Sequence, residues 1–584
     1  MLRTPQQNGL RGWNGLALWF LLLTGASPPE LGAHAILLHT EPVANQRLEA
    51  SPARVLLIFN ERVETVFNSL RVVDAEGHRW DQGEVRVEDG GDTVLVALPP
   101  LERGRYGVFW RITSLDGHQV QGQFGFGVGA DPPTDDQLAA QLPKGDAAVP
   151  GWFFPLFRGI GLGALALWLG GVCFLAAVLL PAISLLPKSD AHLQFSQALR
   201  RSAIICCAAG VAFLGAEVLW LCGKTATFIG LPLTQALSFS SLTAVLTTTS
   251  LGAWWAMRWL SAFLLVVFTA RVLRRKLPEQ RLGIGWLVCF TLLAAVLLAT
   301  LAATGHARAV AKGTLLAQAA DWIHLASTTI WIGSVFHLLL LLSQARQRDA
   351  LSIELLNRAA HRFSQVAQYC VLALLPTGIY SSWLHLPSWS SFLSTDYGRV
   401  LSTKLGLVSL TLLVAYINWS RALPALANYV KALEKAMRWS GRLRQLVQAE
   451  VVLGTLIVVL AAVLTNLPPA ASVAGGGTTD LRQRAGDYFV SLHLDPNKVG
   501  KNQALVTLQD SSGGNLAGAR RVTVYLRSLD MDMGLSTVEA QPTPNGNYQA
   551  EIYLSMAGRW TISVEVTPAR GDGFVAEFQI TSAL

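Results

Sequence analysis

Long apolar segments separate two regions of the chain in which apolar and polar residues alternate. Eight apolar segments follow one another, at residues 153–181, 202–222, 251–272, 283–303, 315–343, 363–386, 399–420 and 446–466. An α-helix crosses a bilayer with roughly 20 apolar residues, so each segment is long enough to span. The pattern predicts an eight-helix transmembrane bundle over residues 151–466.

The residues before the bundle alternate with the period of two that is typical of β-strands. Turn residues separate the alternating runs, which lie at 55–59, 70–73, 94–98, 106–112 and 118–128. Short strands at this spacing indicate an all-β domain, a Greek-key barrel or sandwich, over residues 34–129. Residues 130–150 are rich in Pro, Asp, Ala and Gly and are interpreted as the linker to the membrane.

Alternation returns after the last apolar segment. The runs lie at 488–492, 504–508, 521–526, 548–554 and 560–566. They predict a second all-β domain, a sandwich, over residues 487–584. Residues 467–486 contain three consecutive glycines from Gly475 and are predicted to be a second linker.

Composition limits the class of protein. Of 584 residues, 51% are apolar and 14% are charged, whereas about a quarter of the residues of soluble proteins are charged. The formal net charge is +8, but the basic residues crowd into the short connections between apolar segments, as membrane topology requires. These features exclude a soluble enzyme, a disordered chain and a nucleic-acid-binding protein, and they make the lipid bilayer a partner of the helices.

Residues 1–33 have the pattern of a secretory signal peptide. Two arginines precede an apolar stretch, Trp13–Leu23, that is too short to span, and small residues end the segment at Ala33. Cleavage after Ala33 would make His34 the first residue of the mature chain. An uncleaved membrane anchor is the alternative.

The basic residues of the connections predict the orientation of the bundle. An export signal places the first domain outside, and the connections then alternate between the inner and outer sides. Eighteen Lys and Arg residues fall in the predicted inner connections, whereas four fall in the outer ones: Lys224, Arg308, Lys312 and Arg399. Because inner loops carry the excess of positive charge, we expect a multi-pass protein of the bacterial cytoplasmic membrane with both terminal domains extracytoplasmic.

The clearest chemical pattern combines His34 with the segment Ser114-Leu115-Asp116-Gly117-His118. Asp-Gly is a tight-turn pair, so His118 would open the last strand of the first domain, with Asp116 close by. A free N-terminal His34 offers its α-amino and imidazole nitrogens as one chelate, His118 adds a second imidazole and Asp116 an oxygen. Such nitrogen and oxygen donors suit Cu(II), and binding should weaken on acidification.

An Asp-Gly-His segment alone is more often only a structural turn; its combination with His34 favours the metal site. With Pro42 and the continuation Gly122-x-Phe124-x-Phe126-x-Val128, these residues resemble the CopC family of copper-binding proteins. The resemblance implies a small β-barrel on which His34, Asp116 and His118 bind Cu(II). The methionine-rich loop of some members has no counterpart, because residues 34–150 contain no Met.

Ionisable residues at membrane depth are costly and usually face a bundle interior. Asp321 and His324 are three residues apart and share a helix face, and His306 precedes their helix on the outer side. For His324 the alternative is a helix–helix hydrogen bond, and for Lys404 and Glu450 it is an internal ion pair.

Several motifs of this region resemble the CopD family, which is often fused to CopC and implicated in copper uptake. They are Thr304-Gly305-His306-Ala307, Asp321-x-x-His324 with Trp331-Ile332-Gly333, Arg362-Phe363-Ser364, Tyr397-Gly398-x-x-Leu401-x-x-Lys404 and Glu450. The resemblance favours a copper path through His306, Asp321 and His324. His361, at a predicted inner loop, is a weaker candidate for an exit ligand; a solvated interfacial histidine is the alternative.

Soft sulfur donors occur in two places. Met531, Met533 and Met556 lie in the second β domain, where thioethers suit Cu(I) and His493 is a possible further ligand; methionine as core filler is the alternative. Residues near these methionines resemble YtkA-like domains. The six cysteines, in or beside the apolar segments, are possible Cu(I) ligands too, but an isolated cysteine is commonly just a small buried residue: Cys173, Cys206, Cys207, Cys222, Cys289 and Cys370.

Together these patterns predict a copper-binding membrane protein that captures Cu(II) outside and mediates copper import, with periplasmic copper chaperones as possible partners. No nucleotide-binding P-loop occurs, and no enzyme activity is predicted. The alternatives are a membrane-anchored copper chaperone or sensor, a membrane cytochrome that uses His324 and His337, and an oxidative copper enzyme built on the N-terminal His.

Overall fold

The computed structural model describes most of the chain. The described residues are 35, 37–59, 62–65, 69–88, 90–114, 119–134, 137–138, 149–184, 191–229, 232–274, 284–305, 314–344, 350–386, 389, 391–467, 470, 478–498, 500–510, 514, 518–529, 535–554, 558–569 and 572–582. The predicted signal peptide, residues 1–33, lies outside them.

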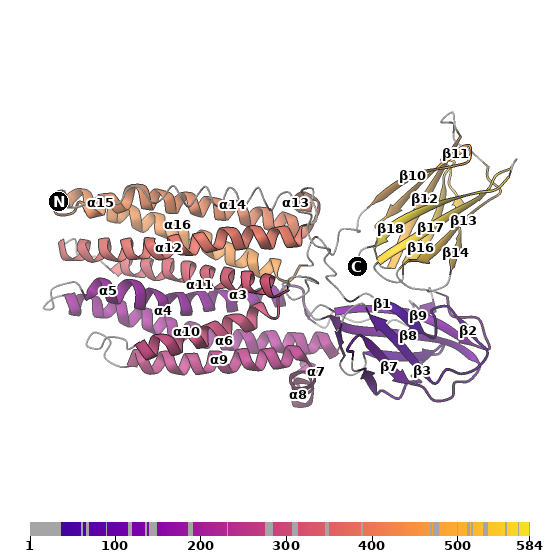
Figure 1. The fold of residues 1–584 in the computed structure, drawn as a ribbon, viewed down its shortest axis with the longest axis horizontal. Helices are drawn as coiled ribbons and strands as arrows, with labels where there is room; N and C mark the ends of the chain where they lie inside the picture. The colour runs from indigo at the N-terminus through magenta and orange to yellow at the C-terminus, as the bar shows by residue number, and fades with distance from the viewer. Residues whose placement is uncertain are drawn as a thin grey trace.

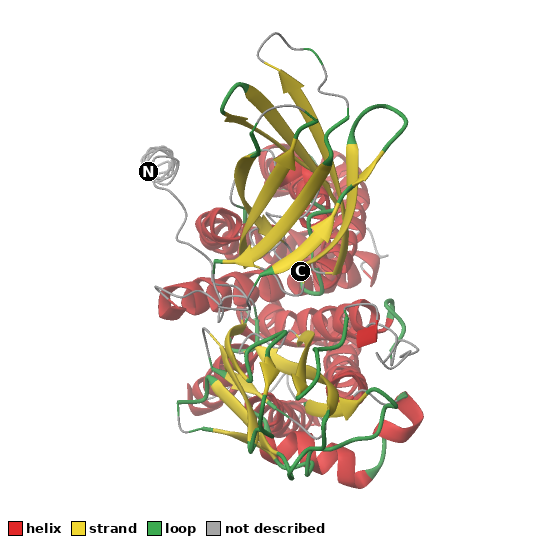
Figure 2. Cartoon of the chain, turned by 90° about the vertical axis from the view of Figure 1, so that its right-hand side faces the viewer, coloured by secondary structure: helices red, strands yellow, loops and turns green. Residues whose placement is uncertain are grey.

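Two β domains lie side by side at one end of a long helical bundle (Figure 1). Seen along the bundle, both domains stand in front of the helix ends (Figure 2). The chain therefore has an all-β part, a helical part and a second all-β part, in the order that the alternation and the apolar segments predict.

The N-terminal domain is formed by two facing sheets. Its strands are β1 (Leu37–Glu41), β2 (Arg47–Leu48), β3 (Arg54–Phe59), β4 (Val63–Glu64), β5 (Leu70–Asp74), β6 (Val85–Val87), β7 (Thr93–Ala97), β8 (Gly104–Ser114) and β9 (Gln119–Val128). One sheet has the order β1-β3-β7-β6; the other has the order β2-β9-β8-β4, with β5 also paired to β8. The apolar positions of the alternating runs, such as Val55, Leu57 and Phe59, are buried in the core.

Among the described residues, the helical part contains eight long helical stretches and several short helices. Their bounds are α3 (Phe153–Leu165), η1 (Ala166–Gly170), α4 (Gly171–Cys173), η2 (Phe174–Leu179), α5 (Leu180–Ile183), α6 (Ala191–Ile229), α7 (Leu233–Ala236), α8 (Phe239–Thr248), α9 (Ser250–Arg274), α10 (Ile284–Ala302), α11 (Thr314–Gln344), α12 (Ala350–His385), α13 (Ser391–Ser394), α14 (Asp396–Ile417), η4 (Asn418–Ala422), α15 (Leu423–Ala427) and α16 (Leu433–Leu464).

Seven helical stretches of the described chain are long and apolar enough to cross a membrane, one fewer than the eight predicted. The remaining predicted segment, 363–386, lies in α12, whose apolar character is interrupted by polar residues such as Gln368, Thr377 and Ser381. α12 nevertheless packs along α11 inside the bundle (Figure 1). Its Thr377 lies 3.0 Å from Nδ1 of His324 on α11, so one of these polar residues has a partner on a neighbouring helix.

The first span is irregular because two π-helical turns, η1 and η2, interrupt it. At η1 the backbone of this first span lies against the backbone of α11. A Cβ on Gly170 would lie 2.4 Å from the carbonyl oxygen of Thr329, and one on Gly333 would lie 1.9 Å from that of Ala166. Only glycine permits this close crossing of two helices.

The C-terminal domain is a sandwich of two antiparallel sheets. Its strands are β10 (Thr479–Ala485), β11 (Tyr488–Asp495), β12 (Gly500–Asp510), β13 (Arg521–Ser528), β14 (Ser536–Glu539), β15 (Gln541–Pro542), β16 (Tyr548–Leu554), β17 (Gly558–Thr567) and β18 (Phe574–Ser582). The sheet orders are β10-β11-β12-β16-β15 and β14-β13-β17-β18.

Strand β10 corrects the prediction that residues 467–486 are all linker. Thr479–Ala485 pairs in register with β11, at the edge of its sheet. The sequence there, TDLRQRA, is mostly polar because most of its side chains remain exposed. An edge strand with exposed side chains lacks the apolar alternation that marks a half-buried strand.

The two β domains contact each other directly. The side-chain Nε2 of Gln123, on β9, donates to the hydroxyl of Tyr553, on β16, at 3.2 Å. Gln123 is buried, so this contact belongs to a packed interface.

Candidate metal centre

The predicted Cu(II) ligands His34, Asp116 and His118 lie outside the described residues, as does the predicted path residue His306. Their chain neighbours are described. The segment that carries Asp116 and His118 joins β8 to β9, which pair antiparallel as far as Thr113 and Gln119.

The chain neighbours of the predicted ligands gather at one end of the N-terminal domain. Leu37, at the start of β1, pairs with Phe59 at the end of β3. The next strand, β4, pairs with the end of β8 through Val63 and Ser114. Ala35 and Ser114 are both only 2% exposed. Thus the chain start after His34 and the hairpin end before Asp116 belong to the same end of the core.

This end of the domain is attached to the helical bundle. The carboxylate Oε1 of Glu64, on β4, accepts a hydrogen bond of 3.0 Å from the backbone N–H of Ser250, the first residue of α9. Free N–H groups at a helix N-terminus favour a negative charge. Glu64 is paired with Thr113, so the attachment lies beside the hairpin that carries Asp116 and His118.

A cavity of about 920 Å³ lies inside the bundle. Near the β domains it is lined by residues at helix ends, such as Phe154 of α3 and Asn466 just after α16. Further in it is lined by Thr329 and Val335 of α11. The predicted path residues Asp321 and His324 both line it. The structure thus brings these two residues together in a space large enough for a hydrated ion.

The hydrogen bonds of His324 determine which of its nitrogens is available to a ligand. Nδ1 lies 3.0 Å from the hydroxyl of Thr377, and that hydroxyl donates its own hydrogen to the carbonyl of Ala373 at 2.7 Å. The oxygen of Thr377 therefore accepts from Nδ1–H, and Nε2 of the neutral ring carries a lone pair. A second bond that fixes the tautomer in this way is typical of metal-binding histidines.

Two glycines allow the backbone to come close to these side chains. A Cβ on Gly305 would lie 3.4 Å from Oδ2 of Asp321, and one on Gly378 would lie 3.4 Å from Cε1 of His324. An added Cβ would therefore be in van der Waals contact with the carboxylate or the imidazole, so both side chains lie next to glycine backbone.

Charged residues from other helices surround Asp321 in the cavity wall. Arg158 of α3 and Lys404 of α14 both line the cavity and interact electrostatically with Asp321. Glu450 of α16, 4% exposed, accepts a bond of 2.7 Å from the amide of Asn418. From the sequence, an internal ion pair was the alternative for Glu450. The described partner of its carboxylate is instead a neutral amide.

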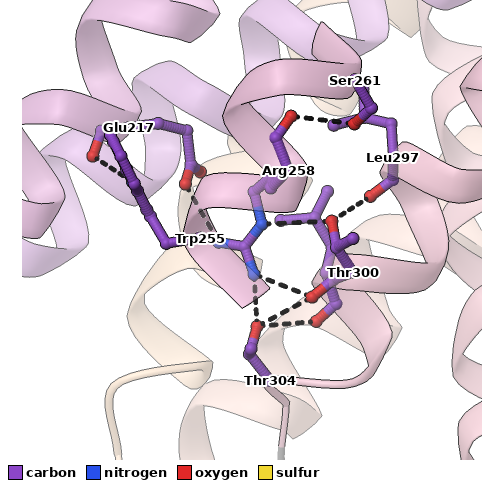
Figure 3. Close-up of polar contacts among 8 residues, drawn as sticks. Glu217, Trp255, Arg258, Ser261, Leu297, Thr300 and Thr304 are labelled. Atoms are coloured by element: carbon purple, nitrogen blue, oxygen red, sulfur yellow. Dashed lines mark hydrogen bonds and ion pairs between the residues drawn. The ribbon is translucent and has the colours of Figure 1, made fainter. Parts of the chain in front are cut away.

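A buried ion pair supports the C-terminal end of α10 (Figure 3). Arg258, 1% exposed, donates from Nη1 to Glu217 at 3.0 Å. Its Nη2 donates to the carbonyl of Thr300 at 2.8 Å and to the hydroxyl of Thr304 at 2.5 Å. The guanidinium thus binds the C-terminal end of a helix, where a positive charge is favourable, directly before Gly305 and the predicted ligand His306.

Two other histidines have structural partners. His361, the weaker candidate for an exit ligand, is exposed, and its Nδ1 lies 3.0 Å from the carbonyl of Asn357 on its own helix. His337 is fully buried, and its Nε2 lies 3.1 Å from the carbonyl of Leu167. This packing against another helix does not favour haem ligation by His337.

The candidate methionines Met531, Met533 and Met556 also lie outside the described residues. The described strands around them meet at one end of the sandwich, where Ser528 pairs with Trp560 and Leu529 N–H donates to Arg559 O. His493 lies on the other sheet of the sandwich, and its Nδ1 is 2.6 Å from Oδ1 of Asp480. Among the residues that the structure describes, no group of three or more His, Cys, Asp or Glu is arranged to hold a metal ion.

Sequence reasoning missed two residues that shape the cavity. Arg158 is a lone arginine in an otherwise apolar predicted span, and this signal was available. Thr377 had no such signal, because a threonine on a helix usually bonds its own backbone; only the packing of α11 on α12 makes it the partner of His324.

Four family models match consecutive stretches of the chain. The CopC domain matches residues 37–129 and the YtkA-like domain matches 482–565. Between them, the Copper resistance protein D-like N-terminal domain matches 147–317 and Copper resistance protein D matches 357–464. The chain belongs to the CopC–CopD copper-resistance family. It is a multi-pass protein with the two CopD regions in its helical part and a YtkA-like domain at its C-terminal end.

Curated relatives agree with this assignment. The Copper transport protein CutJ of Bacillus subtilis (strain 168) is 28% identical over 560 residues, which are 95% of this chain and 96% of CutJ. Protein YobA of Escherichia coli (strain K12) is 31% identical over 110 residues, which are 18% of this chain and 89% of YobA.

Two solved structures match part of this CopC–CopD protein. CopC from Methylosinus trichosporium OB3b is 31% identical and matches 18% of this chain and 98% of its own, with a TM-score of 0.15. PcoC, a methionine-rich copper resistance protein from Escherichia coli, is 24% identical and matches 16% of this chain and 98% of its own, with a TM-score of 0.15.

Proposed function

We propose that this CopC–CopD protein captures Cu(II) outside the cytoplasmic membrane and carries copper inward through its helical bundle. The observation that carries the proposal is the cavity at membrane depth, which Asp321 and His324 both line. Nδ1 of His324 is engaged by Thr377, so Nε2 is the nitrogen left for a metal ion. Imidazole and carboxylate are suitable copper ligands.

Capture takes place on the N-terminal domain. The α-amino group and imidazole of His34, the imidazole of His118 and a carboxylate oxygen of Asp116 are the proposed ligands. The burial of Ala35 and Ser114 at one end of the core supports their convergence, because each is within two residues of a proposed ligand. The proposed ligand set contains no sulfur, which favours Cu(II) over Cu(I).

Transfer from the domain to the bundle requires that the capture site face the membrane part. The hydrogen bond between Glu64 and Ser250 supports this geometry. It attaches the end of the domain that carries the proposed site to the start of α9. From there the proposed path leads through His306, at the outer end of the bundle, to Asp321 and His324. Both β domains are then extracytoplasmic, and the methionines of the C-terminal domain are available to a reduced copper ion.

The proposal is tested by copper uptake into proteoliposomes that contain the full chain. We expect His324→Ala and Asp321→Asn each to lower the initial rate at least tenfold. His361→Ala is the matched control: its imidazole is exposed and bonds its own helix, so its rate should equal that of the wild type. Equal rates for wild type and His324→Ala would refute transport through the cavity.

The same assay decides between transport and a membrane-anchored chaperone or sensor. If the helices serve only as an anchor, replacing His306, Asp321 and His324 together by Ala leaves uptake unchanged. The capture site is tested separately by Cu(II) titration of the mature chain. One extra residue before His34 would remove the amino-terminal chelate, and we expect it to weaken binding at least 100-fold.

A further inference from the structure

A thiol and an imidazole from different helices meet inside the bundle. Cys206 of α6 and His337 of α11 both have 0% exposure. Both contact one carbonyl of the irregular first span, that of Leu167. Nε2 of His337 lies 3.1 Å from this oxygen and Sγ of Cys206 lies 3.9 Å from it. The two side chains therefore converge on one point of the π-helical turn η1, and π-turns often occur at functional sites.

Gly171 leaves space between the two donor atoms. A Cβ on Gly171 would lie 2.3 Å from Nε2 of His337 and 2.6 Å from Sγ of Cys206. The distance from Nε2 of His337 to Sγ of Cys206 is therefore at most the sum of these two Cβ distances. With bond lengths like those of zinc sites, an ion bound linearly between one thiolate and one imidazole spans roughly 4.3 Å from sulfur to nitrogen. The pair is thus close enough to share one ion.

The imidazole of His337 can change its tautomer when an ion binds to Nε2. Its Nδ1 is buried and has no hydrogen-bond partner among the described residues, while Phe174 stacks on the ring with centroids 6.1 Å apart. Nε2–H is the group that donates to Leu167. When a metal takes Nε2, the proton moves to the unpartnered Nδ1 and the ring stays neutral.

The cavity reaches residues close in the chain to Leu167 and His337. Its lining includes Ala166, which precedes Leu167, and Val335, which is two residues before His337. Along α11, His337 is 13 residues beyond His324, a rise of about 20 Å at 1.5 Å per residue. The pair therefore lies deeper in the bundle than Asp321 and His324.

We propose that Cys206 and His337 form a binding site for one monovalent soft metal ion, Cu(I). Before it reaches this site, the captured Cu(II) takes one electron from a small-molecule thiol outside the protein. At the site, one bond forms from copper to sulfur and one from copper to Nε2, and the thiol proton of Cys206 is released to water. A thiolate and a monovalent ion sum to zero charge with a neutral imidazole. A divalent ion would leave a net positive charge in a fully buried site, which is costly, and thiolate ligands select Cu(I).

This site deepens the proposed transport function, and rests on it only for the route by which the ion arrives; binding itself is measured without transport. The full chain in detergent is titrated anaerobically with Cu(I) against a chromophoric Cu(I) chelator. Cys206→Ser and His337→Gln are compared with Cys222→Ser, the matched control, since Cys222 is a buried cysteine on the same helix. We expect the first two variants to lose one Cu(I) equivalent and the control to retain it.

X-ray absorption of the copper-loaded proteins provides a second readout. The difference between wild type and Cys206→Ser should contain one sulfur and one nitrogen neighbour. If Cys206→Ser does not fold, His337→Gln, whose amide still donates to Leu167, serves in its place. Equal Cu(I) stoichiometry in all three variants would overturn the site. If copper uptake is insensitive to His324→Ala but the Cu(I) equivalent is lost, the transport proposal fails and the site stands.

Discussion

Glu64 and Ser250 connect the N-terminal β domain to the helical bundle through one hydrogen bond of 3.0 Å, from a backbone N–H to a carboxylate. The two residues are 186 positions apart in the chain. Glu64 lies opposite Thr113 on β8, so the bond is next to the hairpin on which Asp116 and His118 are predicted to bind copper. The contact thus relates the proposed capture site to the start of α9.

Removal of this contact should separate capture from transport. We expect Glu64→Ala to lower copper uptake several-fold, because the domain loses a charge-assisted bond worth about 1.5–3 kcal/mol. Cu(II) affinity of the same protein should stay unchanged. The control is Glu49→Ala, which removes a carboxylate that is 88% exposed. An equal loss of Cu(II) affinity and uptake in Glu64→Ala would show that Glu64 acts on the capture site itself.

The bond between Thr377 and His324 should determine the affinity of the cavity for copper. Thr377→Val removes the oxygen that accepts from Nδ1–H, so the ring is no longer held in the tautomer that frees Nε2. Loss of such a second bond typically lowers metal affinity 10–100-fold, and we expect copper uptake to reach half its maximum at a correspondingly higher concentration. Thr411→Val, which also changes a cavity-lining threonine, should leave this concentration unaltered.

The pair Arg258–Glu217 should behave as a buried ion pair whose partners depend on each other. Arg258→Met leaves the carboxylate of Glu217, 4% exposed, without its cation, and we expect a loss of about 3–5 kcal/mol. The double variant Arg258→Met/Glu217→Leu should recover part of it. Thermal unfolding in detergent tests the order of the three proteins. A double variant less stable than Arg258→Met would contradict the prediction.

Asp74 should make one turn of the N-terminal domain sensitive to acid. Burial raises the pKa of its carboxyl, but hydrogen bonds from the Trp80 indole and from His78 outweigh this effect, so the pKa lies below its usual value. A depressed pKa stabilises the folded turn above the unfolded value of about 4, and this contribution is lost as pH falls through the folded pKa.

Hydrogen exchange of the full chain tests this dependence. Amides of residues 70–81 should lose protection as the pH falls below about 4, after correction for the intrinsic exchange rate. Asp74→Asn should be less protected at neutral pH and should lose this pH dependence. Protection in the wild type that is constant down to pH 2 would rule out the role of the carboxylate.

Periodicity alone was sufficient for the elements that are half-buried or uniformly apolar. The strands β3, β8 and β17 and the span α10 lie where the pattern places them, because burial requires apolar residues at fixed spacing. It failed for β10, whose side chains remain mostly exposed, and it did not show the π-turns of the first span. Those turns arise where η1 contacts α11, a relation between distant segments.

The sequence by itself determined the three-part architecture, the family and the residue types available to copper, because hydrophobic spacing and motif chemistry are local properties of the chain. The tertiary structure decided which groups act together. Thr377 selects the free nitrogen of His324, Arg158 and Lys404 surround Asp321, and Gly171 leaves space between Cys206 and His337. Each of these relations joins different helices, so helix packing alone establishes it.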